Sequence, residues 1–189
     1  MQYTSNNMEQ RAVLEAASRM CAAARTAPKA KGMDNVVTLV LTGEDVVALS
    51  EKMKEIGLRQ FGKPEGHFAR DAANLLQAQA VVMIGVRRVR YGLPYCSMCG
   101  FASCAECQRA GANCAFAPMD LGIALGSAVA TAADLRVDSR ILFSAGKAAE
   151  EMGYLDGDIL WQGVPISIRG KNPFFDRKPS LWQTEEKHA

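Results

Sequence analysis

The stretch PMDLGIALGSAVATAA, residues 118–133, predicts a long helix that neighbouring parts of the chain can approach closely. Many of its residues are glycine, alanine or serine, whose small side chains leave room for another backbone or for a ligand. The segment from Gly122 to Ser127 lacks both the G-x-G-x-x-G pattern and the lysine of a phosphate-binding P-loop. Close helix packing is therefore expected here rather than a nucleotide site.

Helices and strands alternate on both sides of this helix. Apolar residues recur at helical spacing in several segments, and the short apolar runs at 36–41 and 81–86 are typical of buried strands. Thr42 and Asp45 resemble a capping box that opens a helix, and Gly57 is expected to end it. The predicted helices are 8–24, 42–56, 68–76, 118–133 and 147–152, and the predicted strands are 36–41, 81–86, 141–143 and, as a strand or hairpin, 159–168. The sequence thus predicts a mixed α+β protein.

The overall composition is that of an ordinary globular protein, with 49% hydrophobic residues, 22% charged residues and a formal net charge of +2. Such a balance argues against a disordered tail and against a nucleic-acid-binding protein. The sequence has no apolar run of about 18 residues or more and no basic-then-apolar signal at its start. We therefore expect a single α+β domain over residues 1–189, located in the cytoplasm, with no membrane or nucleic-acid partner.

The strongest chemical signal is a group of cysteines in residues 94–116, which we expect to form a cysteine-rich insert. The run CSMCGFASCAEC, residues 96–107, is followed by Cys114, so that five of the six cysteines lie close together. Cytoplasmic thiols are kept reduced, which favours metal binding over disulfides. A four-iron cluster needs four converging thiolates, and the C-x2-C-x4-C spacing supplies three of them from a sharply bent chain. Gly100 suits that bend.

The first three predicted ligands are Cys96, Cys99 and Cys104. Cys107 and Cys114 are both available as the fourth, and Cys114 is favoured because it returns to the loop from farther along the chain and can close its far side. Structural zinc is the competing interpretation, since zinc also takes four thiolates. Two zinc-binding pairs are usually separated by about 15–20 residues, far more than the gap between Cys99 and Cys104, so the spacing favours the cluster.

These residues resemble an uncharacterised family of prokaryotic proteins described as containing a ferredoxin domain. The stretches that carry the resemblance are CSMCGFASCAEC, CAFAPMDLGIALGSAVATAADLRVDSRILFSAG and AARTAPKAKGMDN. The cysteine run is also similar to the C-x2-C-G-[FY]-x2-C module of electron-transfer and corrinoid iron–sulfur proteins, in which a later cysteine completes the set. This resemblance implies a [4Fe-4S] cluster held by Cys96, Cys99, Cys104 and Cys114, and it names no substrate.

A second, fainter resemblance is to the flavin-dependent nitroreductases. Its matching pieces are AARTAPKAKG, DLGIALGSAVATAADL and WQGVPISIRG. It implies a nitroreductase-like sheet with flanking helices, and a homodimer that holds flavin mononucleotide (FMN) at the subunit interface. In this chain Lys29 stands where that family usually has a serine after the Ala-Pro pair. Arg25, Lys29 and Lys31 supply charge for a flavin phosphate, although a solvated surface loop explains the same three residues.

Three functions remain open on these grounds. The first is an electron carrier, in which the four cysteines ligate a cluster that exchanges electrons with a redox partner protein or a small-molecule acceptor. The second is a nitroreductase-like oxidoreductase in which FMN exchanges two electrons with a substrate and the cluster supplies them singly. The third is a structural module whose loop is stapled by zinc or by a cluster. Only the second would make the protein an enzyme, and no catalytic residue is identified.

Overall fold

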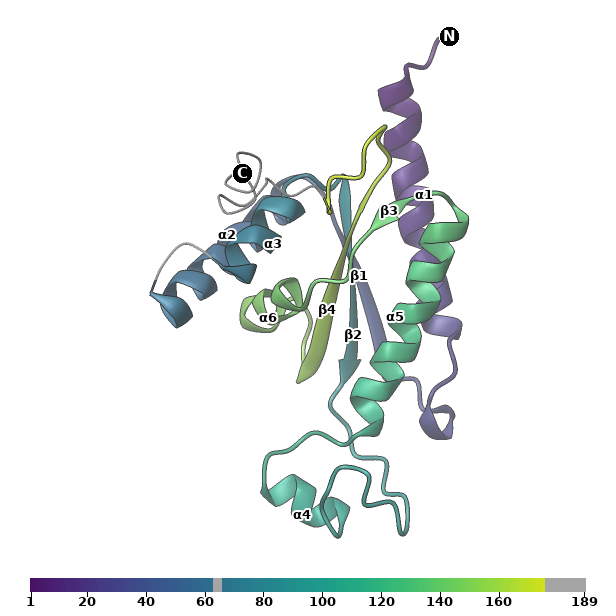
Figure 1. Cartoon of the computed structure of the whole chain (residues 1–189). Helices are drawn as coiled ribbons and strands as arrows, with labels where there is room; N and C mark the ends of the chain where they lie inside the picture. The colour runs from purple at the N-terminus through teal and green to yellow at the C-terminus, as the bar shows by residue number, and fades with distance from the viewer. Residues whose placement is uncertain (63–65, 176–189) are drawn as a thin grey trace, which may run out of the picture.

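An antiparallel sheet of four strands lies between two layers of helices in the computed structural model, which describes residues 1–62 and 66–175 (Figure 1). The strands in spatial order are β1 (Val36–Leu41), β2 (Ala80–Arg87), β4 (Ile159–Ser167) and β3 (Asp138–Ser139). Each strand is antiparallel to its neighbours. The predicted α+β fold is confirmed within the described residues, and residues 176–189 of the expected domain lie outside them.

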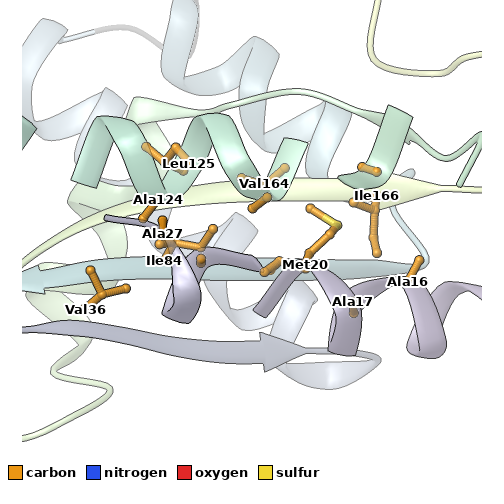
Figure 2. Packing of buried hydrophobic residues seen from close by; sticks show 14 of the residues in the cluster. Ala16, Ala17, Met20, Ala27, Val36, Ile84, Ala124, Leu125, Val164 and Ile166 are labelled. Carbon is orange, nitrogen blue, oxygen red and sulfur yellow. The ribbon is translucent and has the colours of Figure 1, made fainter. Parts of the chain in front are cut away.

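Two long helices, α1 (Ser5–Thr26) and α5 (Phe116–Asp134), cover one face of the sheet (Figure 1). Side chains alternate across a strand, so that every second residue of β2 faces these helices. Figure 2 shows Met20 of α1, Ala124 of α5 and Ile84 of β2 in the resulting apolar layer. The small residues of α5 let it pack directly against α1, as the sequence indicated.

The opposite face carries α2 (Glu44–Phe61), α3 (His67–Leu75) and α6 (Phe143–Met152). Trp161 of β4 is buried among them and lies over Gly85 of β2, where an added Cβ would be only 2.6 Å from the indole ring. Because a larger residue at position 85 would collide with Trp161, the sheet requires glycine there. A short 3-10 turn (Ala30–Gly32) precedes β1.

The prediction for residues 42–57 is wrong at both ends. α2 begins at Glu44 after Gly43, and no side chain caps it, so the expected capping box of Thr42 and Asp45 does not form. The helix also continues through Gly57 to end at Gly62, which adopts the left-handed conformation that favours glycine. Gly57 is needed inside the helix, because its Cβ would lie 3.0 Å from the Cβ of Phe68.

The prediction of a strand at 141–143 is also wrong. Leu142 exchanges two backbone hydrogen bonds with Gly163 as an isolated bridge, and α6 begins at the next residue. The regular pairing lies earlier, at the two residues of β3. The segment 159–168, predicted as a strand or a hairpin, is one strand, β4, which ends at Ser167.

α5 is long and apolar enough to cross a membrane when judged by length and composition alone, with a mean hydropathy of 1.4. In the structure its buried side chains pack against α1 and β2. A core helix of a globular protein can have the same length and composition, so these two properties alone do not identify a membrane span. The packing against α1 and β2 makes α5 part of the core.

The hydroxyl of Tyr154 is expected to make the stability of the fold depend on pH. Its hydroxyl is buried and has no hydrogen-bond partner among the described residues. Burial, and then the charge of Asp45, raises the pKa of Tyr154 from 10.0 to about 12. The hydroxyl of Tyr154 therefore loses its proton at a lower pH in the unfolded chain than in the folded chain. The contribution of the neutral hydroxyl to the free energy of unfolding is complete below pH 10 and is lost as the pH rises towards 12.

Tyr154→Phe is expected to leave the free energy of unfolding at pH 7 unchanged or to raise it by up to about 1 kcal/mol, because it removes an unsatisfied buried hydroxyl. The same variant should lose less stability than the wild type between pH 10 and pH 12. Urea denaturation of both proteins at several pH values measures the two effects. Equal alkaline losses would contradict the assignment to Tyr154.

Candidate metal centre

The cysteine-rich segment joins the end of β2 to the start of α5. It contains a short helix, α4 (Cys104–Arg109), and lies at one end of the molecule, beyond the sheet and its two helix layers (Figure 1). β2 and α5 belong to the buried core, so both ends of the segment are firmly held. This arrangement agrees with a cysteine-rich insert carried by an α+β scaffold, although its predicted bounds, 94–116, stay a prediction.

A tight turn follows Cys96 and contains Cys99. The amide of Gly100 donates a hydrogen bond to the carbonyl oxygen of Ser97 at 2.9 Å. Gly100 has a φ of 82°, as the sequence indicated, and the non-glycine residues Tyr95 and Ser97 also have positive φ, 53° and 45°. Such conformations are strained for residues with a Cβ and occur most often at functional sites. The turn brings Cys96 and Cys99 to the same side of the segment.

α4 positions the next two cysteines, and it was not predicted from the sequence. The Ser103 hydroxyl caps the helix by accepting a hydrogen bond from the amide of Glu106 at 3.2 Å. Glu106 in turn accepts one from the amide of Ala102 at 3.2 Å. Cys104 is the first helical residue, and Cys107 follows one turn later. The S-x-x-E pattern at 103–106 is the sequence signal that identifies such a helix start.

One small cavity, of about 40 Å³, brings four of the cysteines together. Most of its lining residues lie between Leu93 and Cys104, and Ala115 also lines it. The cysteines that line it are Cys96, Cys99, Cys104 and Cys114. These are the four residues that the sequence suggested as ligands. Cys96 directly precedes the 97–100 turn, Cys99 lies within it, Cys104 begins α4, and Cys114 lies two positions before α5.

Cys107 is placed differently from the other four. Its side chain is buried, with 1% exposure, and its Sγ donates a hydrogen bond to the carbonyl oxygen of Ala112 at 3.4 Å. Burial raises the pKa of the Cys107 thiol, and the adjacent Cys99 raises it further. Cys107 is also absent from the residues that line the cavity. The structure therefore separates Cys107 from the group that lines the cavity.

The four cysteines line the cavity but do not form a close group of ligands. Among residues 1–62 and 66–175, no group of three or more histidine, cysteine, aspartate or glutamate side chains is arranged to hold a single metal ion. All six cysteines are free of disulfide bonds. The donor set fits an iron–sulfur cluster chemically, because its ligands are thiolates and because the bent chain places four of them around one space.

A buried hydrogen-bonded group holds the base of the segment against the rest of the fold. The hydroxyl of Tyr91 donates to a carboxylate oxygen of Asp120, whose other oxygen accepts from the amide of Ala30 at 3.0 Å. Burial, followed by the bond to Asp120, raises the pKa of Tyr91 to about 12, so its hydroxyl remains a donor at neutral pH. Sequence reasoning missed this group, although Asp120 is the one acidic residue within 118–133.

The three basic residues predicted for a flavin phosphate each have partners within the chain. Arg25 forms an ion pair with Asp34 at 2.6 Å and donates to the carbonyl oxygen of Val36. Lys29 points to carbonyl oxygens at the end of α1, including that of Ala27 at 2.7 Å. Lys31 donates to the carbonyl oxygen of Tyr91 at 3.0 Å. A phosphate would have to compete with these partners, and the predicted roles of the three residues stay predictions.

Sequence comparisons give two findings. A family model described as "Uncharacterized protein containing a ferredoxin domain (DUF2148)" matches residues 110–177, a range that includes Cys114 and α5. A protein of Archaeoglobus fulgidus, described as an uncharacterized protein, is 42% identical over 172 residues, which cover 87% of this chain and 91% of that protein.

Solved structures with the same fold include flavoproteins. They include a nitroreductase with bound FMN from Bacteroides fragilis, with a TM-score of 0.59, 12% identity, and coverage of 95% of this chain and 85% of that one. A BluB-like flavoprotein from Clostridium difficile has a TM-score of 0.53, 17% identity, and coverage of 100% and 90%. At these identities the likeness shows the fold, and the predicted nitroreductase-like sheet with flanking helices is confirmed.

Proposed function

Because this chain belongs to the family of uncharacterized proteins that contain a ferredoxin domain, we propose that it is an iron–sulfur electron carrier. Both the family and the fold are those of redox proteins. The proposed centre is a [4Fe-4S] cluster, and the proposed ligands are Cys96, Cys99, Cys104 and Cys114. The single observation that carries this proposal is that these four cysteines, and not Cys107, line one cavity.

The chain would contribute ligation and control of the cluster's environment. A cluster held by four thiolates exchanges single electrons, and its reduction potential depends on burial, nearby charge and hydrogen bonds to sulfur. Three of the proposed ligands are Cys96, just before the 97–100 turn, Cys99 within it, and Cys104 at the capped start of α4. The fourth, Cys114, lies two residues before the core helix α5. No side chain is required to move a proton, which fits a carrier better than an acid–base enzyme.

A flavin-containing oxidoreductase is the second candidate. It is supported by the fold and by one contact: the loop that carries Lys29 and Lys31 is bonded to the base of the cysteine segment through Tyr91 and Asp120. FMN held by Arg25 and the two lysines would then lie near the cluster and receive its electrons singly. In that case the protein would be a homodimeric nitroreductase-like enzyme acting on a small-molecule acceptor.

A structural zinc site is the third candidate, because zinc also takes four thiolates. The short spacing between Cys99 and Cys104 disfavours it. In all three cases we place the protein in the cytoplasm as one α+β domain with a cysteine-rich insert at 94–116, and these assignments stay predictions.

Metal and flavin analysis of protein purified without oxygen tests the proposal. We expect about four irons and four sulfides per chain and a broad visible absorption that dithionite bleaches. Flavin released on denaturation, beside the iron, would favour the oxidoreductase over the carrier. One zinc per chain with no iron would refute the cluster and leave the structural module.

A further inference from the structure

Arg90 lies directly beside the cysteine segment. It follows β2 by three residues, is half-buried, and donates a hydrogen bond from Nη2 to the carbonyl oxygen of Ala112 at 3.4 Å. Together with Cys114 it lines a second cavity, of about 50 Å³, under the loop 111–114. The thiol of Cys107 donates to the same carbonyl oxygen of Ala112, also at 3.4 Å, so Arg90 and Cys107 lie close together.

The charge of Arg90 has no counterion among the described residues. The neighbouring Arg88 forms ion pairs with Glu150 and Asp158, so its charge is compensated by the chain itself. Arg90 forms no ion pair within residues 1–62 and 66–175, and its Nε is buried without a hydrogen-bond partner there. A partly buried, uncompensated guanidinium is costly to fold, and such charges are normally paired.

We propose that the positive charge of Arg90 raises the reduction potential of the cluster by acting on its cysteine ligands, a proposal that rests on the proposed function above. Four thiolates give the centre a negative charge, which grows by one unit when an electron enters. A nearby cation stabilises the more negative, reduced form more strongly than the oxidised form. The electron comes from the redox partner, or from dithionite in the test, and no bond forms or breaks at Arg90.

The test compares Arg90→Gln with Arg90→Lys and with Arg109→Gln in the full chain. Arg109 is an exposed residue on α4, so that removal of its charge affects the same segment while water screens the effect. We expect Arg90→Gln to lower the ratio of reduced to oxidised cluster roughly tenfold at a fixed potential, equivalent to about 59 mV for a one-electron couple. Arg90→Lys and Arg109→Gln should each shift the ratio by less than about threefold. Arg90→Lys keeps the positive charge, and the charge that Arg109→Gln removes is already screened by water and salt.

Each preparation is analysed for iron and sulfide before its potential is titrated with dithionite. A fully loaded Arg90→Gln protein with an unchanged potential would overturn the role of Arg90 while leaving the cluster established. Wild-type protein without iron would overturn both proposals. If Arg90→Gln does not retain iron, Arg90→Lys decides: a tenfold shift in that charge-preserving variant would refute a charge effect, and a wild-type potential would support it.

Discussion

Replacement of Cys114 by alanine is expected to remove most of the iron from the protein, whereas replacement of Cys107 by alanine leaves the iron content near that of the wild type. Both residues follow the C-x2-C-x4-C run, and the sequence left either of them open as the fourth ligand. The structure places the two residues differently, and Cys114 as the fourth ligand stays a prediction. Cys114 lines the cavity with the other three thiols, whereas Cys107 is buried and its thiol is hydrogen-bonded to the Ala112 carbonyl oxygen.

The pair makes a matched comparison, because each variant removes one sulfur from the same segment. A cubane cluster with three cysteine ligands and no substitute is labile, so Cys114→Ala should retain less than about a quarter of the iron after purification without oxygen. Thermal unfolding of both variants separates loss of the ligand from loss of the fold. Iron retained in Cys114→Ala but lost in Cys107→Ala would reverse the assignment, and iron retained in both would leave the fourth ligand to another residue.

Local sequence patterns predicted the core elements well. The continuous apolar runs gave β1 at its observed bounds and β2 to within one residue at each end, because a run of β-branched residues bounded by polar ones has few alternatives to a strand. The small residues of 118–133 likewise predicted a closely packed helix, and α5 packs against α1. These features depend on neighbouring residues in the chain.

Features that depend on distant residues were missed. Gly57 reads as a helix end, yet it continues α2 because Phe68, on another helix, occupies the space beside it. Asp120 reads as a lone charge in an apolar helix, yet it joins Ala30 and Tyr91 beneath the cysteine segment. Sequence spacing predicted a ligand set, which stays a prediction, but only the tertiary structure separates a cavity-lining cysteine from a buried one.

The second large effect concerns the core, where Gly146→Ala is expected to destabilise the protein by about 3 kcal/mol or more. α6 lies so close to β4 that a Cβ at position 146 would be 2.0 Å from the carbonyl oxygen of Trp161 and 2.6 Å from its carbonyl carbon. The same close approach is seen from β4, where a Cβ added at Gly163 would be 2.6 Å from the Cβ of Ala145 on α6. The obstacle at position 146 is backbone in the middle of a sheet, which cannot rotate away as a flexible side chain can.

Gly122→Ala is the matched control, since Gly122 is also helical but exposed, with open space where its Cβ would be. Alanine there should raise stability by about 0.5–1 kcal/mol, because glycine loses more backbone entropy in a helix. For a chain of this size, the loss in Gly146→Ala corresponds to a Tm lower by roughly 6–12 °C. Thermal and urea denaturation measure both variants. Equal small changes in the two would mean that α6 can move away from β4, whereas opposite signs would show that its close approach is fixed by the sheet beneath it.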